Sequence, residues 1–297
     1  MKGSAIRHLA AAGSAQRIAA ALFEHTVQIW DLHSGEQVQQ FESVLGFGGR
    51  RLAMSPTGER CVAAAWAKGK RGGVACYDAT TGSVLWHRTD IRQTQRLRFA
   101  PSGEVVWCGV DEDGCVHELS AASGATLQRY RGLRDVIPSA YSKHLLLYAG
   151  ELVVTGGKEF CIPRLTFALL DAVFSPDAVC VSEAGGPVRC VDCFTGEERW
   201  RYDPSGSMHV LTLAHRITDG HFYGVEWATS GTSRILVRFS DVTGRREEVC
   251  TLIRSWEEEF CDAGNVVVTS AGEVKEVAGG ETIQRLAFPE REYADRQ

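Results

Sequence analysis

The sequence predicts an all-β fold of seven repeated units, and three observations lead to this prediction. A turn that ends in glycine recurs seven times, alternating strands flank each turn, and a second kind of turn follows about twenty residues later. The turn glycines are separated by a mean of about 41 residues, the length of one four-stranded propeller blade. We therefore expect a seven-bladed β-propeller of four-stranded antiparallel blades.

The first kind of turn has the form Asp-x-x-Ser/Thr-Gly in its clearest copies. Its glycines are Gly35, Gly82, Gly124, Gly156, Gly196, Gly244 and Gly280. The residue four positions earlier is Asp31, Asp78 or Asp192 in three copies, and serine in two others. An Asp or Ser side chain there accepts hydrogen bonds from backbone N–H groups two or three residues later. Glycine then takes the positive φ that closes a bulged hairpin.

The second kind of turn follows a strand and contains proline in three copies. The segments are MSPTG, APSG and FSPD, with Pro56, Pro101 and Pro176. Proline presets the backbone angle of a turn and cannot donate to the strand ladder, so it ends the strand. Residues His215–Gly220 and Cys261–Gly264 occupy the corresponding places in the sixth and seventh units. Each unit therefore contains two linked hairpins.

These segments resemble two families of propellers. IWDLHSGE, FSPD and MSPTG are similar to WD-repeat proteins, whereas YDATTGSVLW and VDCFTGEERW are equally similar to quinoprotein-like propellers. The resemblance covers about residues 5–288 and implies the fold, because propellers host many functions. The repeats are degenerate: only Trp30 and Asp31 form a Trp-Asp pair, and only Trp86 and Trp200 follow a turn. Quinone-dependent relatives use adjacent cysteines, which this chain lacks, so we expect no cofactor.

The domain organisation follows from the repeat. Residues 1–288 are expected to form a single propeller, with no exchange of strands between the two ends of the chain. Residues 289–297 are polar and are expected to form a loose C-terminal tail.

Composition excludes several classes of protein and predicts a compartment. The chain is 44% hydrophobic and 23% charged with a net charge of −5, which excludes a disordered chain. Arg7, His8 and Arg17 interrupt the alanine-rich start before an export signal or a membrane span is long enough. We therefore expect a cytoplasmic protein with no membrane partner, and ten cysteines that are reduced.

The sequence contains no pattern of a known catalytic or metal site. There is no G-x-S-x-G, P-loop, H-E-x-x-H or dinucleotide-binding motif. Cys190 and Cys193 form the only C-x-x-C, and on a strand entering a turn they should face opposite ways. Cys108 and Cys115 flank the acidic turn Asp111–Gly114, and we expect two free thiols there in preference to a disulfide. The acidic residues themselves are expected to form a simple turn and not a calcium-binding loop. We expect no catalytic residue, metal or cofactor.

Charge is distributed unevenly along the chain. Residues Arg50–Arg134 contain 13 Lys or Arg against 8 Asp or Glu, whereas the remainder is acidic. The predicted partner-binding residues are Lys68, Lys70, Arg71, Arg92, Arg96, Arg131 and Arg134, all expected in loops on one face, together with Trp256 opposite them. Ordinary surface scatter and a surface that steers an acidic protein both remain open interpretations. We expect no nucleic-acid partner, because Trp66 is the sole aromatic residue in the patch.

The sequence thus predicts a non-enzymatic, cytoplasmic module for protein–protein interaction that binds a partner through loops on one face. The prediction includes a stoichiometric inhibitor, such as an immunity protein that neutralises a toxin. Two alternatives remain: a hydrolase or lactonase-like enzyme with its site at the channel mouth, and a sensor of a small molecule or glycan in the central channel.

Overall fold

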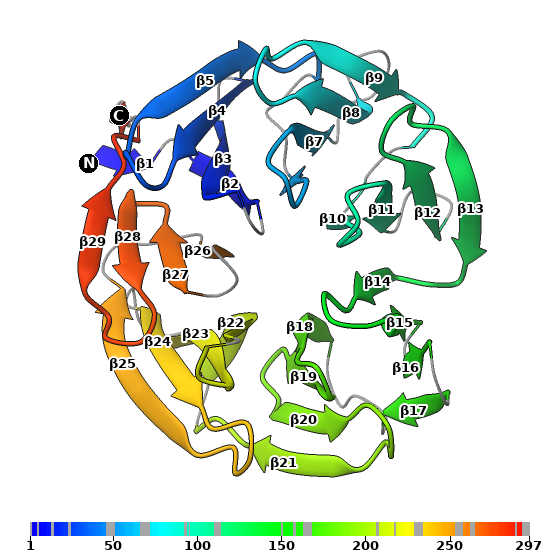
Figure 1. Ribbon diagram of the computed structural model, residues 1–297, viewed down its shortest axis with the longest axis vertical. Coiled ribbons are helices and arrows are strands. Elements are labelled where there is room, and N and C mark those ends of the chain that lie inside the picture. Colours follow the sequence, from blue (N-terminus) through cyan, green and yellow to red (C-terminus); the bar gives the residue numbers. More distant parts are fainter. Residues whose placement is uncertain are drawn as a thin grey trace, which may run out of the picture.

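Twenty-eight strands form seven four-stranded antiparallel sheets arranged as blades around a central channel (Figure 1). This computed structural model describes the chain except residues 1, 5, 13–14, 23–24, 46–50, 66–71, 92–93, 95, 110–113, 150, 157–158, 163–167, 206–207, 217, 229–233, 253–257, 262–264, 289 and 293–297. The prediction of an all-β, seven-bladed propeller is therefore confirmed.

Each blade uses four strands that are consecutive in sequence, the first lining the channel and the fourth lying at the rim. Blades 1 to 4 consist of β2 (Ile6–Ala11), β3 (Arg17–Leu22), β4 (Thr26–Asp31) and β5 (Gln37–Glu42); β6 (Arg51–Met54), β7 (Arg60–Ala65), β8 (Gly73–Asp78) and β9 (Val84–Arg88); β10 (Arg96–Phe99), β11 (Val105–Gly109), β12 (Cys115–Ser120) and β13 (Thr126–Arg131); and β14 (Asp135–Pro138), β15 (Leu145–Tyr148), β16 (Leu152–Thr155) and β17 (Phe160–Ile162). Blades 5 to 7 consist of β18 (Leu169–Phe174), β19 (Ala178–Glu183), β20 (Val188–Asp192) and β21 (Glu198–Tyr202); β22 (Met208–Arg216), β23 (His221–Ala228), β24 (Arg234–Phe239) and β25 (Arg246–Leu252); and β26 (Glu258–Cys261), β27 (Val266–Thr269), β28 (Glu273–Glu276) and β29 (Thr282–Arg285).

The seven predicted turn glycines all join the third and fourth strands of their blades, with φ between +66° and +98°. Asp31, Asp78 and Asp192 each accept two backbone N–H bonds through Oδ1, from the residues two and three positions later. The pairing of third and fourth strands shifts register in every blade except blade 4. The predicted bulged hairpin with an Asp entrance is thus confirmed.

The hydrophobic core is divided into clusters that lie between neighbouring blades, because each sheet buries both of its faces. Between blades 1 and 2, for example, Ile29 packs with Leu52 and Tyr77, and between blades 5 and 6 Trp200 packs with Phe222. The second and third strands are almost continuously buried, as in β7 and β19. The core therefore fixes the blades relative to one another and leaves the loops free to vary.

Fourth strands also bind the next blade by side-chain hydrogen bonds to its turn. The residue four positions after the turn glycine donates to a turn carbonyl oxygen of the next blade in four blades. These bonds are Gln39 Nε2 to Thr80 at 2.5 Å, Trp86 Nε1 to Ala121 at 2.9 Å, Trp200 Nε1 to Asp241 at 2.7 Å, and Gln284 Nε2 to Ser34 at 3.1 Å. The residue just before each donor is the extra, unpaired residue of the register shift in its strand.

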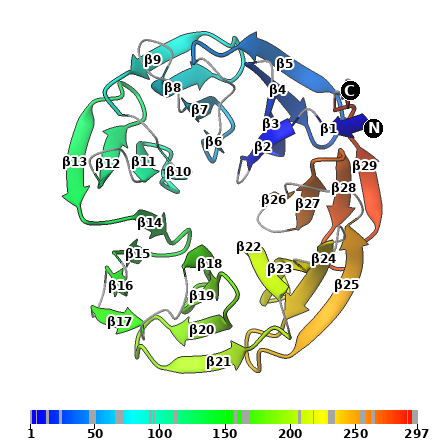
Figure 2. The same ribbon diagram turned by 180° about the vertical axis from the view of Figure 1, so that it is seen from behind.

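The two ends of the chain pair with each other, contrary to the sequence-based expectation. β1 (Lys2–Ser4) and β30 (Glu290–Glu292) form a two-stranded antiparallel ribbon beside blades 7 and 1 (Figure 2). Phe288 packs against Trp30 of blade 1, with ring centroids 4.5 Å apart. The prediction of a loose tail is therefore wrong for β30, because this pairing satisfies backbone groups that a free tail would leave to water. The described part of the chain contains no helix long and apolar enough to cross a membrane.

Candidate functional site

The ring has two unlike faces. The links between blades and the loops between second and third strands emerge on one face, which we call the link face; the remaining turns emerge on the other, the turn face. Each first strand runs from the link face to the turn face, so its first residues stand at the link-face mouth of the channel. Arg51, Arg96 and Asp135 are such first residues.

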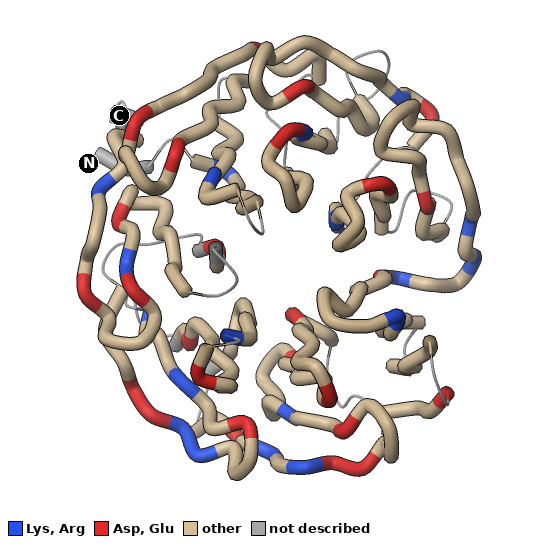
Figure 3. The backbone as a smooth tube through the Cα atoms, viewed as in Figure 1, with Lys and Arg blue, Asp and Glu red and all other residues tan. Residues whose placement is uncertain are grey.

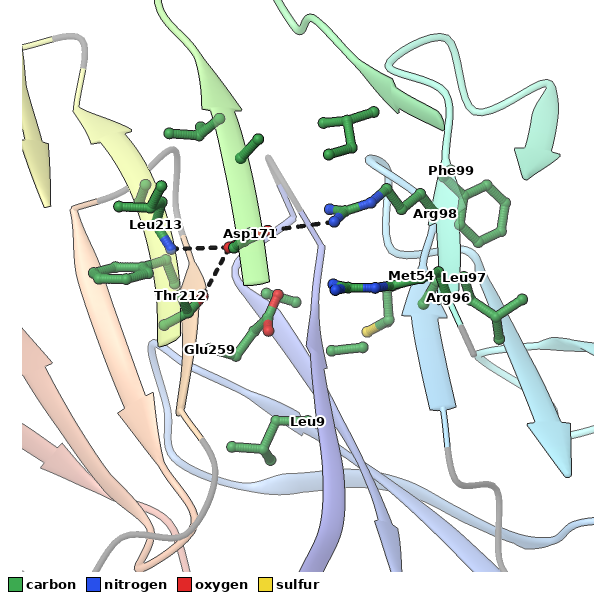
Figure 4. Close-up of a pocket in the computed structure, with 18 of the residues that line it drawn as sticks. Leu9, Met54, Arg96, Leu97, Arg98, Phe99, Asp171, Thr212, Leu213 and Glu259 are labelled. Carbon is green, nitrogen blue, oxygen red and sulfur yellow. Dashed lines mark hydrogen bonds and ion pairs between the residues drawn. The ribbon is translucent and has the colours of Figure 1, made fainter. Parts of the chain in front are cut away.

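The channel holds a cavity of about 750 Å³, a size typical of ligand pockets. Its link-face end is charged, and is lined by His8, Arg51, Arg96, Arg98, Asp171, Arg234 and Glu259. Farther in, the lining includes Met54 and Phe174 together with Tyr141 and His215. Figure 4 shows Arg96 and Arg98 extending from β10 toward Asp171 and Glu259. The cavity is therefore charged at its link-face end and carries both polar and apolar side chains farther in.

Arg96 reaches across the mouth from blade 3 to blade 5. Its Nη2 donates to the carbonyl oxygens of Leu169 and Leu170, at 3.4 and 2.8 Å, and its Nε lies 3.6 Å from Asp135 Oδ2. Asp135 belongs to the intervening blade 4 and is buried. One side chain therefore connects three consecutive blades at the mouth.

Arg98 makes a second bridge beside it. Its Nη2 lies 3.3 Å from Asp171 Oδ1 and 3.7 Å from Asp135 Oδ2. Burial opposes the charge of this guanidinium, but the charges of Asp135 and Asp171 outweigh burial and raise the pKa of Arg98. Asp171 also accepts the backbone N–H of Leu213 at 2.9 Å and the hydroxyl of Thr212 at 3.3 Å. Asp171 is thus held by three hydrogen-bond donors, whereas Asp135 accepts the backbone N–H of Val136 and lies beside the two guanidinium groups.

The histidines of the cavity are neutral at neutral pH. Burial, reinforced by the charges of Arg51 and Arg96, lowers the pKa of His8 to about 3. Burial also lowers the pKa of His215, which lies toward the turn face and whose Nδ1 is 3.1 Å from Tyr141 Oη. Positive charge at the mouth therefore comes from arginine and does not vary across the physiological pH range.

The structure describes three of the eight predicted partner-binding residues. Arg131 is the last residue of β13 and not, as predicted, a loop residue, whereas Arg134 stands in the link just before β14; both are exposed on the link face. Arg96 is wrongly predicted as a loop residue, because it is the first residue of β10 and points into the channel. The remaining five, Lys68, Lys70, Arg71, Arg92 and Trp256, lie outside the described residues.

Sequence reasoning missed the other charged residues of the mouth. Arg51, Arg98 and Asp171 all occur in first strands of their blades. The segment Arg-Leu-Arg-Phe at 96–99 carries the clearest signal, because its charges alternate with apolar residues. That alternation places both arginines on one side of the strand, toward the channel.

The nine cysteines whose side chains the structure describes are free and mostly buried. Cys190 packs between blades 5 and 6 and Cys193 between blades 4 and 5, so the predicted opposite orientation of the C-x-x-C is confirmed. Cys108 and Cys115 are both free and buried, as expected. The acidic residues of the neighbouring turn, 111–113, lie outside the described residues. Within the described chain, no group of three or more His, Cys, Asp or Glu is arranged to hold a metal ion.

Comparisons with known proteins define the fold and no more. No family model matches the sequence, and no curated protein sequence is significantly similar to it. Among solved structures, the chain is similar to that of U3-55K, a WD40-repeat protein, with a TM-score of 0.66 and 12% sequence identity over 90% of this chain and 88% of that chain. This similarity supports the seven-bladed propeller fold of the chain.

Proposed function

We propose that this chain is a non-enzymatic protein-interaction module that binds a partner protein with an acidic surface through its link face. The supporting observation is the gathering of basic side chains from blades 2, 3 and 4 on that face. Arg131 and Arg134 are exposed, and Arg51 and Arg96 stand at the adjoining channel mouth. Such a sector attracts an acidic surface and orients it during encounter.

The carboxylates of the mouth favour binding over catalysis. A general acid or base needs a carboxyl group that can exchange a proton with a substrate. Asp171 is instead engaged by Arg98, Thr212 and the Leu213 N–H, and Asp135 lies beside two arginines. A WD40-like propeller is also a fold that typically mediates protein–protein interactions. A module of this kind acts by covering its partner's surface, as a stoichiometric inhibitor does.

Charge reversal at Arg131 and Arg134 tests the proposal. Wild type, Arg131→Glu/Arg134→Glu and Arg245→Glu serve as baits in a native lysate of the source cells, with retained proteins quantified by mass spectrometry. Arg245 is a matched control because its side chain is 80% exposed on the turn face. We expect one acidic protein to be retained in a stoichiometric amount by wild type and the control. The double variant should retain at least about tenfold less of it, and added salt should release it.

Two results would contradict this function. One is the absence of any stoichiometric protein partner, and the other is a partner whose retention is the same with the double variant and with Arg245→Glu. Circular dichroism of each bait ensures that the comparison is made between folded proteins.

A further inference from the structure

The central channel has room for a small molecule and carries an excess of positive charge at its link-face mouth. Its cavity of about 750 Å³ lies within the range of volumes that protein sites use for such ligands. Figure 3 shows charged residues on the innermost strands, basic on β10 and acidic on β18. Among the described residues, four arginines stand against three carboxylates at the mouth. They are Arg51, Arg96, Arg98 and Arg234, and Asp171, Glu259 and the buried Asp135 beside them.

The contacts of Arg96 and Arg98 leave some of their donors unused. A guanidinium group carries five N–H donors, and Arg96 contacts described residues through Nη2 and Nε only. Arg98 reaches its two carboxylates through Nη2, and its Nε has no hydrogen-bond partner among the described residues. The side chains of Arg96 and Arg98 are 35% and 26% exposed, and both line the cavity. Both guanidinium groups can therefore donate further hydrogen bonds to a molecule in the channel.

Two neighbouring guanidinium groups favour an oxyanion as the ligand. Carboxylates and phosphates match the planar fork of arginine and accept paired N–H bonds from it. Arg96 and Arg98 are two residues apart on β10 and extend in the same direction, so one anion can lie within reach of both (Figure 4). Their contacts with blades 4 and 5 hold both side chains in place before a ligand binds. The mouth is therefore a preorganised site for an anionic group.

The inner part of the cavity indicates the nature of the rest of the ligand. Tyr141 and His215 meet there, with Tyr141 Oη 3.1 Å from His215 Nδ1. Burial lowers the pKa of His215 and raises that of Tyr141, so both side chains are uncharged at neutral pH. Met54 and Phe174 contribute apolar surface to the lining. An uncharged body that carries hydrogen-bonding groups fits this part of the cavity.

We propose that the channel binds a small organic oxyanion, a carboxylate or a phosphate ester, whose anionic group is held at the link-face mouth by Arg96 and Arg98. The uncharged part of the ligand extends toward Tyr141 and His215. This site lies inside the ring and takes a small molecule, so it goes beyond the protein-binding function proposed for the link face.

Ligand-induced stabilisation tests the proposal. The probes are succinate and citrate as carboxylates, and inorganic phosphate and glycerol phosphate as phosphates, with sodium chloride at equal ionic strength as the salt control. We expect at least one probe, at about ten times its Kd, to raise Tm by about 2–4 °C. Arg96→Gln should weaken binding of that probe at least about tenfold in isothermal titration calorimetry. Arg245→Gln should leave it unchanged, because Arg245 is exposed on the turn face.

Arginine modification of the wild-type protein gives a second readout that requires no variant to fold. Phenylglyoxal labels accessible guanidinium groups, and peptide mapping by mass spectrometry gives the labelling rate of each arginine. A probe at about ten times its Kd should slow the labelling of Arg96 by about tenfold, because only the unoccupied site reacts. The labelling rate of Arg245 should not change.

Three results would overturn the proposal. The first is that no probe stabilises the protein more than sodium chloride does. The second is a probe that leaves the labelling of Arg96 unchanged and binds Arg96→Gln as well as wild type. The third is loss of probe binding in Arg131→Glu/Arg134→Glu, which would place the anion on the outer surface of the link face. Probe binding retained by that double variant, together with loss of its native partner, supports two separate sites.

Discussion

Trp86 Nε1 donates a hydrogen bond to the carbonyl oxygen of Ala121 at 2.9 Å, and its ring fills the space where a Cβ atom on Gly124 would stand. The fourth strand of blade 2 is thereby fixed to the turn of blade 3. Trp200 and Gly244 repeat the arrangement between blades 5 and 6. The turn glycine is thus needed for its positive φ and also for the close approach of the preceding blade.

Gly124→Ala should destabilise the protein more than Gly114→Ala. Both glycines have φ near +70°, but a Cβ at position 124 would lie 2.7 Å from Trp86 Cδ2, whereas none lies within 4 Å at position 114. Backbone strain alone costs about 1–2 kcal/mol, and the clash adds about 1–3 kcal/mol. Urea denaturation measures the difference. Equal losses for the two variants would show that the contact with Trp86 contributes nothing.

Asp192→Asn should lower the free energy of unfolding by about 1–2 kcal/mol at neutral pH. Burial opposes ionisation, but Arg199 and the N–H groups of Phe194 and Thr195 lower the pKa of Asp192 to about 2. Because the folded pKa lies below the unfolded value near 3.9, this stabilisation is complete above about pH 5 and is lost as the pH falls toward 2. Urea midpoints between about pH 3 and pH 7 should converge for wild type and variant at the acidic end.

Asp203→Asn is the matched control for this measurement. Asp203 also pairs with an arginine, Arg201, but its side chain is 65% exposed. Its substitution should change the free energy of unfolding by less than about 0.5 kcal/mol at every pH. An equal effect of the two substitutions would contradict the role given to the Asp192 turn.

Cys161 should react with iodoacetamide far faster than Cys190 or Cys193 in the native protein. Cys161 is exposed, whereas burial raises the pKa of the other two thiols to about 12 and closes access to them. Peptide mapping by mass spectrometry gives the rate for each cysteine separately. Denaturant should remove the difference. Comparable alkylation rates in the native protein would show that Cys190 and Cys193 are accessible. They would contradict the conclusion that these two thiols are buried.

The blades could be predicted from the sequence because local interactions form their turns. The turn at Asp78 and Gly82 depends on hydrogen bonds within four residues and on a glycine φ, so its pattern survives in a degenerate repeat. The pairing of β1 with β30 joins residues at opposite ends of the chain, and no local pattern reports it. The error at Arg96 has a similar cause, since its partners at 169 and 170 lie 73 and 74 positions away.

The sequence by itself determined the number of blades, the place of each turn and the opposite orientation of Cys190 and Cys193, because these follow from periodicity and short-range geometry. Only the tertiary structure decided which arginines enter the channel and which remain exposed, because closure of the ring sets those distances. The same holds for Val38 and Leu85: their spacing from the turn glycine is visible in the sequence, but the structure shows that each is the unpaired, exposed residue of a register shift.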